Sequence, residues 1–414
     1  MTARPLRNVQ TAHPVSRLIL ARQEIDKAVH KWQSGNGASI EAQKVAIVNL
    51  KSLNVVIRAS DICNQNCLYC YVSEGARKGG PRIALPRLER FFRSILSGVI
   101  FTHVNIVWHG GEPTLLGTEY LSNAIRLASG VKAPHVTIEH AIQTNASALS
   151  DSMVNLFLRE KVIVGISMDA PPEVHDRFRV SWSGRPTLKR VMAGADKLRK
   201  AGIPFGAICV LHSGNYHRAQ EIYAFFKEQR LSYQLNPFYG AEAVTGEATK
   251  TLAITPEQYA EALVETFDMY INDAEHTIDV KDIRDILTSM MTGASTNCLF
   301  RGACDEFVGV TTDGNVYVCD NFGLPDALIA SIDTVTGRDI IQSKAIRFIK
   351  ERPAVLQSGF CKGCRWWAIC RGGCSSKARA VFGSQHREDP FCESRKVLFG
   401  RMASFVNTLQ KEEP

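Results

Sequence analysis

Long apolar runs are missing from this chain of 414 residues. A membrane-spanning helix needs about 18 consecutive apolar residues, so the sequence predicts none. The first twenty residues contain arginines but no apolar segment followed by a small-residue cleavage site, which argues against a secretory signal peptide. Internal repeats and low-complexity tracts are missing too. We therefore expect a cytoplasmic protein that does not bind a membrane.

A strong excess of one charge is also missing. The chain has 49 Lys and Arg residues and 41 Asp and Glu residues, and its net charge of +8 is spread along the sequence. The basic residues are not interleaved with stacking aromatics, so nucleic-acid binding is not predicted. A hydrophobic fraction of 45% and a charged fraction of 22% are typical of a packed protein and exclude global disorder.

Cysteine, by contrast, is abundant. Cytosolic thiols stay reduced, so clustered cysteines in such a chain point to metal binding rather than to disulfides. Cys209 stands alone within an apolar segment and is predicted to be a buried core residue. The other eleven fall in two groups, which are Cys63, Cys67 and Cys70 near the start, and Cys298, Cys304, Cys319, Cys361, Cys364, Cys370, Cys374 and Cys392 near the end.

Apolar patterning predicts an α/β fold. Short β-branched segments alternate six times with segments of helical spacing, which indicates a parallel sheet closed into a full or partial (β/α)6 barrel with its ligand site at the carboxyl ends of the strands. The predicted strands are 53–60, 103–108, 135–145, 161–169, 203–211 and 231–237. The predicted helices are 85–98, 118–129, 150–160 (with Ser150 as N-cap), 187–200 and 215–229.

Outside this alternation the pattern changes. We expect a helical extension at 1–50, helices at 256–273 and 280–292, and an amphipathic helix from about 395 to 410. From Cys298 onward the sequence looks rich in loops, with a hairpin signal at 310–319. The predicted domains are the extension 1–50, a barrel 51–240, a helical connector 241–297, a cysteine-rich domain 298–394 and a C-terminal helix 395–414.

Three cysteines directly follow the first predicted strand. Cys63, Cys67 and Cys70 are separated by three and by two residues. Three thiolates can hold one [4Fe–4S] cube and leave one iron without a protein ligand, as chemistry at a metal site requires. A structural zinc site is the alternative, although no fourth ligand is obvious nearby.

The segment Cys63-Asn-Gln-Asn-Cys67-Leu-Tyr-Cys70 resembles the signature of the radical S-adenosylmethionine superfamily. The resemblance implies that the open iron binds S-adenosylmethionine, and that one electron cleaves this cofactor to methionine and a 5′-deoxyadenosyl radical. The radical abstracts a hydrogen atom from the substrate, while the protein orients the cofactor and excludes water. A reductant such as flavodoxin or ferredoxin is then expected as a partner.

Further motifs follow in order at the ends of the predicted strands. Gly110-Gly111-Glu112-Pro113 is similar to the family's GGEP motif, in which glycines allow close backbone approach and the carboxylate holds the cofactor's ammonium. Ala170 stands where one branch of the family has glycine. The resemblance implies cofactor contacts for Tyr69, Gly110, Gly111, Glu112, Asn145, Ser167, Asp169 and Arg179.

The later cysteines resemble the seven-cysteine SPASM signature, and Cys298 adds an eighth thiol. By analogy with the anaerobic sulfatase-maturing branch, two auxiliary [4Fe–4S] clusters are expected, and two zinc ions are the alternative. Asp320 matches the position of a proposed proton acceptor in that branch, or is a turn residue. The expected ligands are Cys298, Cys304, Cys319 and Cys374 for one cluster, and Cys361, Cys364, Cys370 and Cys392 for the other.

Fully ligated clusters suit electron transfer, so the resemblance implies an oxidative radical enzyme with S-adenosylmethionine and three [4Fe–4S] clusters. The leading expectation is a peptide maturase that makes a cross-link or a dehydrogenated side chain. The alternatives are a sulfatase maturase that makes formylglycine from Cys or Ser, and a dehydrogenase of a small sugar-like alcohol. A non-catalytic electron carrier or a zinc-organised interaction protein is disfavoured, because neither needs an open iron or the GGEP motif.

Overall fold

The computed structural model describes residues 51–240, 251–293, 295, 297–319 and 323–412, without the side chains of 51 and 409–412. The expected extension 1–50 and the candidate proton acceptor Asp320 lie outside the described residues. Among the helices that are described, none has both the length and the apolar character that a membrane crossing requires.

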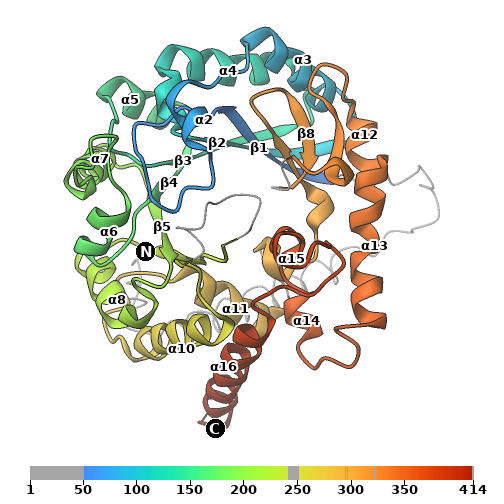
Figure 1. Cartoon of the computed structure of the whole chain (residues 1–414). Coiled ribbons are helices and arrows are strands. Elements are labelled where there is room, and N and C mark those ends of the chain that lie inside the picture. The colour runs from blue at the N-terminus through green and yellow to red at the C-terminus, as the bar shows by residue number, and fades with distance from the viewer. Residues whose placement is uncertain (1–50, 241–250, 294, 296, 320–322, 413–414) are drawn as a thin grey trace, which may run out of the picture.

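Six parallel strands form the first part of the fold, as the alternating pattern predicted. Helices between the strands form an outer ring around them (Figure 1). The strands are β1 (Lys51–Ser60), β2 (Phe101–Gly110), β3 (Thr137–Thr144), β4 (Ile163–Ser167), β5 (Phe205–Leu211) and β6 (Tyr233–Pro237). The main ring helices are α3 (Leu85–Leu96), α4 (Thr118–Val131), α5 (Asp151–Arg159), α7 (Leu188–Lys200) and α8 (Ala219–Glu228). The predicted α/β class is confirmed.

The core lies between the strands and this ring. Val55 and Ile57 of β1 have no exposed surface, and α3 buries Phe91 and Phe92 from one face, as period-2 and period-3.6 patterns require. Cys209 of β5 is also fully buried, as predicted. Two short helices were not predicted, α2 (Glu74–Gly79) and α6 (Pro172–Phe178).

The sheet continues beyond the six parallel strands. Its order is β6-β5-β4-β3-β2-β1-β7-β8-β9, so a strand from the predicted cysteine-rich domain joins the barrel sheet. β7 (Phe307–Val310) runs parallel to β1, from Asn54 opposite Phe307 to Ile57 opposite Val310. The predicted hairpin is present as the antiparallel pair of β7 and β8 (Asn315–Val318), and β9 (Leu328–Ser331) completes the sheet.

The expectation of a loop-rich region after Cys298 is wrong. The structure contains α12 (Gly337–Gln342), α13 (Lys344–Ser358), α14 (Trp367–Cys370) and α15 (Ser375–Phe382). α13 buries Ile346, Ile349 and Leu356 along one face although Pro353 lies inside it. Proline usually ends a helix, and here the tertiary packing of the apolar face outweighs that preference.

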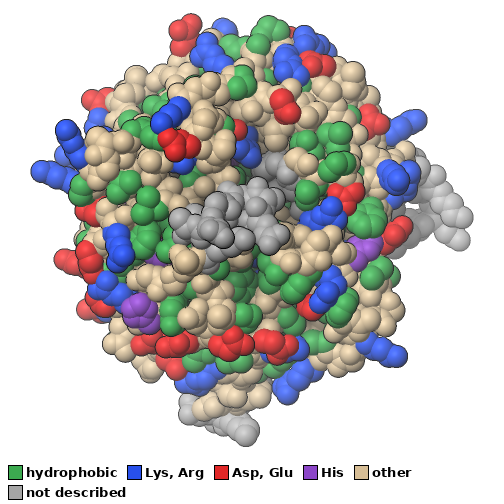
Figure 2. Space-filling model, in the orientation of Figure 1, with side chains coloured by type: hydrophobic (Ala, Val, Ile, Leu, Met, Phe, Trp, Pro, Cys, Tyr) green, Lys and Arg blue, Asp and Glu red, His purple; other side chains and the backbone are tan. Residues whose placement is uncertain are grey.

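Three further helices complete the fold. α10 (Pro256–Asn272) and α11 (Lys281–Thr292) match the predicted helices, and α16 (Cys392–Glu412) extends away from the body of the molecule (Figure 1). α16 begins three residues before the predicted boundary, which places Cys392 in its first turn. Figure 2 shows Lys and Arg side chains distributed around the rim of one face, and a row of Asp and Glu side chains along its lower part.

Candidate functional site

Three thiols lie on the loop that leaves the carboxyl end of β1. Backbone hydrogen bonds attach this loop to neighbouring segments, from Cys63 N to Arg77 O (2.9 Å), from Asn66 N to Val180 O (2.7 Å) and from Leu68 N to Phe178 O (2.9 Å). Trp182 Nε1 also donates to Cys63 O at 2.8 Å. The loop is therefore fixed before any ligand binds.

Burial raises the pKa of two of these thiols. The pKa of Cys63 rises to about 12, with smaller contributions from Glu112, Cys67 and Cys70, and the pKa of Cys67 rises to about 11. The contributions of Cys67 and Cys70 to the pKa of Cys63 show that the three thiols are neighbours. Gln65 Nε2 is buried beside them without a partner among the described residues, and a buried unpaired donor fits a site that is completed by a bound group.

The Gly110-Gly111 pair packs against the start of the cysteine loop. A Cβ atom on Gly110 would lie 2.1 Å from Ser60 O, and one on Gly111 would lie 2.1 Å from Asp61 O. Gly111 N donates to Ser60 O at 3.1 Å, and Glu112 N donates to Ile62 O at 2.8 Å. Glycine is therefore needed here because two backbone segments approach closely.

Glu112 joins the ends of two strands. Its carboxylate accepts hydrogen bonds from Thr114 N (3.0 Å), Thr114 Oγ1 (2.5 Å), Thr144 Oγ1 (2.7 Å) and Asn145 N (2.7 Å), and only 2% of the residue is exposed. Burial raises the pKa of Glu112, although these hydrogen bonds oppose the rise. The carboxylate fixes the loops after β2 and β3, and its expected contact with the cofactor's ammonium stays a prediction.

Two more predicted cofactor residues point toward the same edge of the sheet. Asn145 Nδ2 donates to Asn64 Oδ1 at 2.8 Å and lies 3.8 Å from Cys63 Sγ, which links the end of β3 to the cysteine loop. Ser167 Oγ accepts from Gln143 Nε2 at 2.9 Å. Both residues remain candidates for cofactor binding.

Asp169, Tyr69 and Arg179 form a buried cluster. The Asp169 carboxylate accepts from Arg179 Nε (2.9 Å), Arg179 Nη2 (3.1 Å), Val210 N (2.9 Å) and the Tyr69 hydroxyl, and it has no exposed surface. Burial alone would raise the pKa of Asp169, but the Arg179 charge and these hydrogen bonds hold it below its ordinary value. Asp169 thus positions Tyr69 and Arg179, and its expected contact with the cofactor stays a prediction. Ala170 is fully buried next to it and lies outside the left-handed region.

The eight later cysteines lie in two places in the structure, and their roles as cluster ligands stay a prediction of the resemblance. Burial raises the pKa of the Cys298 and Cys374 thiols, and smaller contributions from Cys304 to both, and from Cys374 to Cys298, show that the three thiols are neighbours. Cys304 and Cys319 pack against the same small cluster of Val318, Ala345, Ile346 and Ile349. Ser375 Oγ donates to Cys304 Sγ at 3.3 Å.

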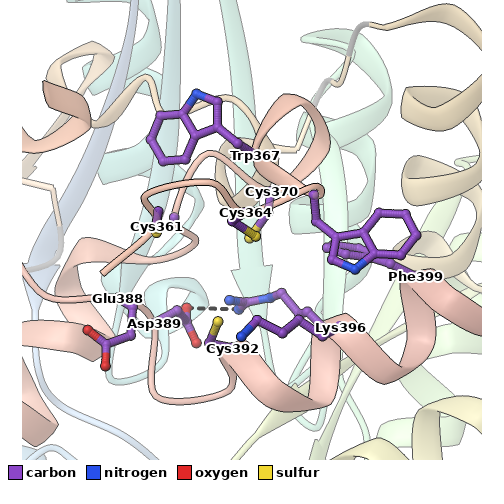
Figure 3. Close-up of a pocket in the computed structure, with 12 residues that line it drawn as sticks. Cys361, Cys364, Trp367, Cys370, Glu388, Asp389, Cys392, Lys396 and Phe399 are labelled. Carbon is purple, nitrogen blue, oxygen red and sulfur yellow. Dashed lines mark hydrogen bonds and ion pairs between the residues drawn. The ribbon is translucent and has the colours of Figure 1, made fainter. Parts of the chain in front are cut away.

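The other four cysteines line a single pocket. Cys361, Cys364 and Cys370 come from the segment around α14, and Cys392 faces them from the start of α16 (Figure 3). Trp366, Trp367 and Phe399 form its apolar walls. Among the described residues, no three Cys, His, Asp or Glu side chains converge closely enough to hold one metal ion.

Two residues of this pocket were missed by sequence reasoning. Arg395 and Asp389 form a buried ion pair at 2.8 Å among the four thiols. Asp389 precedes α16 and Arg395 lies inside it, so no single helical or strand period relates the two residues. Charged residues near cysteines are common at surfaces, and only the folded structure shows that these two are buried.

Comparison with known proteins agrees with this geometry. The Radical SAM superfamily model matches residues 57–226. A cysteine-type anaerobic sulfatase-maturating enzyme of Clostridium perfringens is 27% identical over 360 residues, which cover 84% of this chain and 95% of the relative. A serine-type enzyme of Bacteroides thetaiotaomicron is 25% identical over 383 residues, with 87% of this chain and 92% of the relative covered.

Solved structures give the same result. Native anSMEcpe with bound AdoMet has a TM-score of 0.75 and 25% identity, and the match covers 87% of this chain and 100% of that chain. Streptococcus suis SuiB bound to precursor peptide SuiA, at 16% identity and a TM-score of 0.59, shares the fold. Residues 57–226 are therefore a radical SAM domain, and the chain is a homologue of the anaerobic sulfatase-maturating enzymes along most of its length.

Proposed function

We propose that this protein is a radical SAM maturase that oxidises a Cys or Ser side chain of a protein substrate to formylglycine. The observation that carries the proposal is the extent of the likeness to the sulfatase-maturating enzymes. It spans 360 residues and 95% of one relative, so it continues well beyond the radical SAM domain into the region of the later cysteines.

The leading expectation from the sequence, a cross-linked or dehydrogenated peptide, has less support than this alternative. The cysteine-type and serine-type maturases align with nearly their whole length. SuiB, whose structure is known with its precursor peptide, is similar only in fold. The comparisons therefore favour a substrate side chain of Cys or Ser.

The residues at the barrel edge fit the cofactors that the family implies. Cys63, Cys67 and Cys70 would hold one [4Fe–4S] cluster, and Gly110, Gly111, Asn145 and Ser167 would contact S-adenosylmethionine. When bound, these groups supply the radical that removes a hydrogen atom from the substrate. Glu112 keeps the strand ends in place, and Asp169 holds Tyr69 and Arg179, so the site is organised before substrate enters.

The later cysteines would hold two auxiliary clusters that accept the electron lost by the substrate, with Asp320 as the acceptor of its proton. The four-thiol pocket supports this assignment for the second cluster. A small reductant protein such as flavodoxin or ferredoxin would supply electrons.

The test is an anaerobic assay with three sulfatase-derived peptides that differ only in carrying Cys, Ser or Ala at the target position. We expect a new aldehyde, trapped by a hydrazide and located by mass spectrometry, in the Cys or the Ser peptide and none in the Ala peptide. Cofactor cleavage without an aldehyde in either peptide would overturn the assignment. A cross-linked product would restore the leading expectation.

A further inference from the structure

The pocket of four cysteines contains a cationic side chain with an unused donor. Arg395 lines the pocket together with Cys361, Cys364, Cys370 and Cys392, and only 4% of it is exposed. Its Nη2 atom donates to Asp389 Oδ2 at 2.8 Å, whereas Nη1 is buried with no hydrogen-bond partner among the described residues. A buried charged donor without a partner is costly, so the structure needs an acceptor here.

Asp389 connects this pocket to the other set of later cysteines, which consists of Cys298, Cys304, Cys319 and Cys374. Its Oδ2 atom also accepts from Cys374 N at 2.7 Å, and its Oδ1 atom accepts from Phe391 N at 2.9 Å. Cys374 belongs to that other set, while Arg395 lies on the helix that begins at Cys392. One carboxylate therefore fixes a backbone donor of one group and the guanidinium of the other.

Close packing holds the pair in place. Gly373 has a φ of +67°, and a Cβ atom there would lie 2.2 Å from Arg395 Nη1 and 2.5 Å from Asp389 Cβ. Because the cationic guanidinium lines the same pocket as the four thiols, it favours negative charge on their sulfur atoms.

We propose that Arg395, positioned by Asp389, donates a hydrogen bond to the iron–sulfur cluster on Cys361, Cys364, Cys370 and Cys392 and raises its reduction potential above that of a cluster without this donor. The inference rests on the proposed function, since it needs a cluster at these cysteines. Positive charge and hydrogen bonds to sulfur stabilise the reduced, more negative form of such a cluster. Reduction adds one electron from an external donor, and no covalent bond forms or breaks.

The test is a redox titration of the full chain, followed by electron paramagnetic resonance, in a background with Cys63, Cys67 and Cys70 replaced by Ala. The signal that Cys392→Ala removes belongs to this cluster. Arg395→Met should lower the ratio of reduced to oxidised cluster about tenfold at a fixed potential. For one electron this is a shift of about 59 mV to lower potential. If the single variant does not fold, the charge-balanced pair Asp389→Asn with Arg395→Met takes its place.

Two matched variants separate this role from a structural one. Asp389→Asn leaves the guanidinium unneutralised, so it should shift the potential upward. Lys396→Met removes another cation of the same pocket. Because the Lys396 side chain is 43% exposed and paired with Glu393, the reduction potential of the cluster should change much less in this variant. Equal shifts for the Arg395 and Lys396 variants, or no shift for Arg395 at full iron content, would overturn the inference. An iron content showing no cluster at these cysteines in the wild type would instead refute the proposed function.

Discussion

Single residues at this site hold the strand ends together as much as they face the ligand. Glu112 accepts four hydrogen bonds from two loops, and Asp169 is completely enclosed by its donors. Such carboxylates are sensitive to substitution, because removing one leaves several buried donors unsatisfied.

Glu112→Ala should therefore destabilise the chain before any ligand is added. The backbone N–H groups of Thr114 and Asn145 would each lose their acceptor, at a cost of about 1–3 kcal/mol per group. Urea unfolding of the metal-free chain measures the loss, with the exposed Glu119→Ala as control. We also expect weaker binding of S-adenosylmethionine. Unchanged stability combined with lost cofactor binding would show that Glu112 acts directly on the cofactor.

Asp320→Asn tests the proposed proton acceptor. The variant keeps the shape of the side chain and removes the base, so product formation should fall by about 10²–10⁴-fold, while cleavage of S-adenosylmethionine continues in the presence of substrate. Deoxyadenosine and product are quantified in the same reaction. Normal product yield would leave Asp320 as a turn residue, and loss of both products would place it in binding.

Loops that follow neighbouring strands depend on one another. The segment after β2 rests on the segment after β1 through Gly110 and Gly111, and Trp182 supports the same loop through Cys63 O. The position of the three thiols is therefore set by contacts between elements rather than by the cysteine loop alone.

Gly111→Ala should displace the cysteine loop, because the added Cβ would lie 2.1 Å from Asp61 O and 2.4 Å from Ile62 O. We expect loss of about four irons per chain, the content of one cluster, while the auxiliary iron stays bound. Iron analysis after anaerobic reconstitution measures this. Gly98→Ala, where a Cβ atom has no neighbour within 4 Å, is the control, and equal iron in both variants would contradict the prediction.

The sequence predicted those elements whose signal is local. Periodicity predicted the six parallel strands and the helices between them, whereas the division of the later cysteines into two ligand sets came from the family resemblance. α13 was missed because Pro353 lies inside it, and α2 and α6 are too short for a periodic signal. The pairing of Asp389 with Arg395 and of β1 with β7 depends on tertiary contacts, which no local pattern encodes.

At the scale of the whole molecule, the three thiol sites predict the metal content. Reconstituted protein should carry about twelve irons per chain, and replacing Cys63, Cys67 and Cys70 together by Ala should leave about eight and abolish cofactor cleavage. Iron, sulfide and zinc are measured on the same sample. Zinc in proportion to the cysteines, with no uptake of iron, would refute the cluster assignment.

Buried histidines make the fold sensitive to acid. Burial lowers the pKa of His140, His175 and His212 to about 4, whereas the unfolded chain binds these protons at about pH 6.5. Between pH 6.5 and 4 the unfolded state therefore holds more protons, and each histidine lowers the unfolding free energy by about 1.4 kcal/mol per pH unit as the pH falls.

His140→Phe should reduce this pH dependence by about half a proton on average between pH 7.5 and 5.5, because only the lower half of that interval lies below the pKa of an unfolded histidine. Phe keeps a similar shape at a position where the His140 ring stacks on Trp108 at 6.3 Å. Urea unfolding of the metal-free chain at pH 7.5 and 5.5 measures the slope. The exposed Leu158→Phe, which removes no titratable group, is the control. An unchanged slope in His140→Phe would mean that folding does not lower the pKa of this histidine.

The parallel pairing of β1 with β7 has a consequence for synthesis of the chain. Asn54 is opposite Phe307, which lies about 250 residues later in the chain. A ribosome that adds about 5–20 residues per second needs about 12–50 s to synthesise that stretch. During this interval the nascent barrel carries an uncovered strand edge, and such edges invite pairing with other chains. Chaperone supply and translation speed should therefore govern how much of this protein reaches its folded state in a cell.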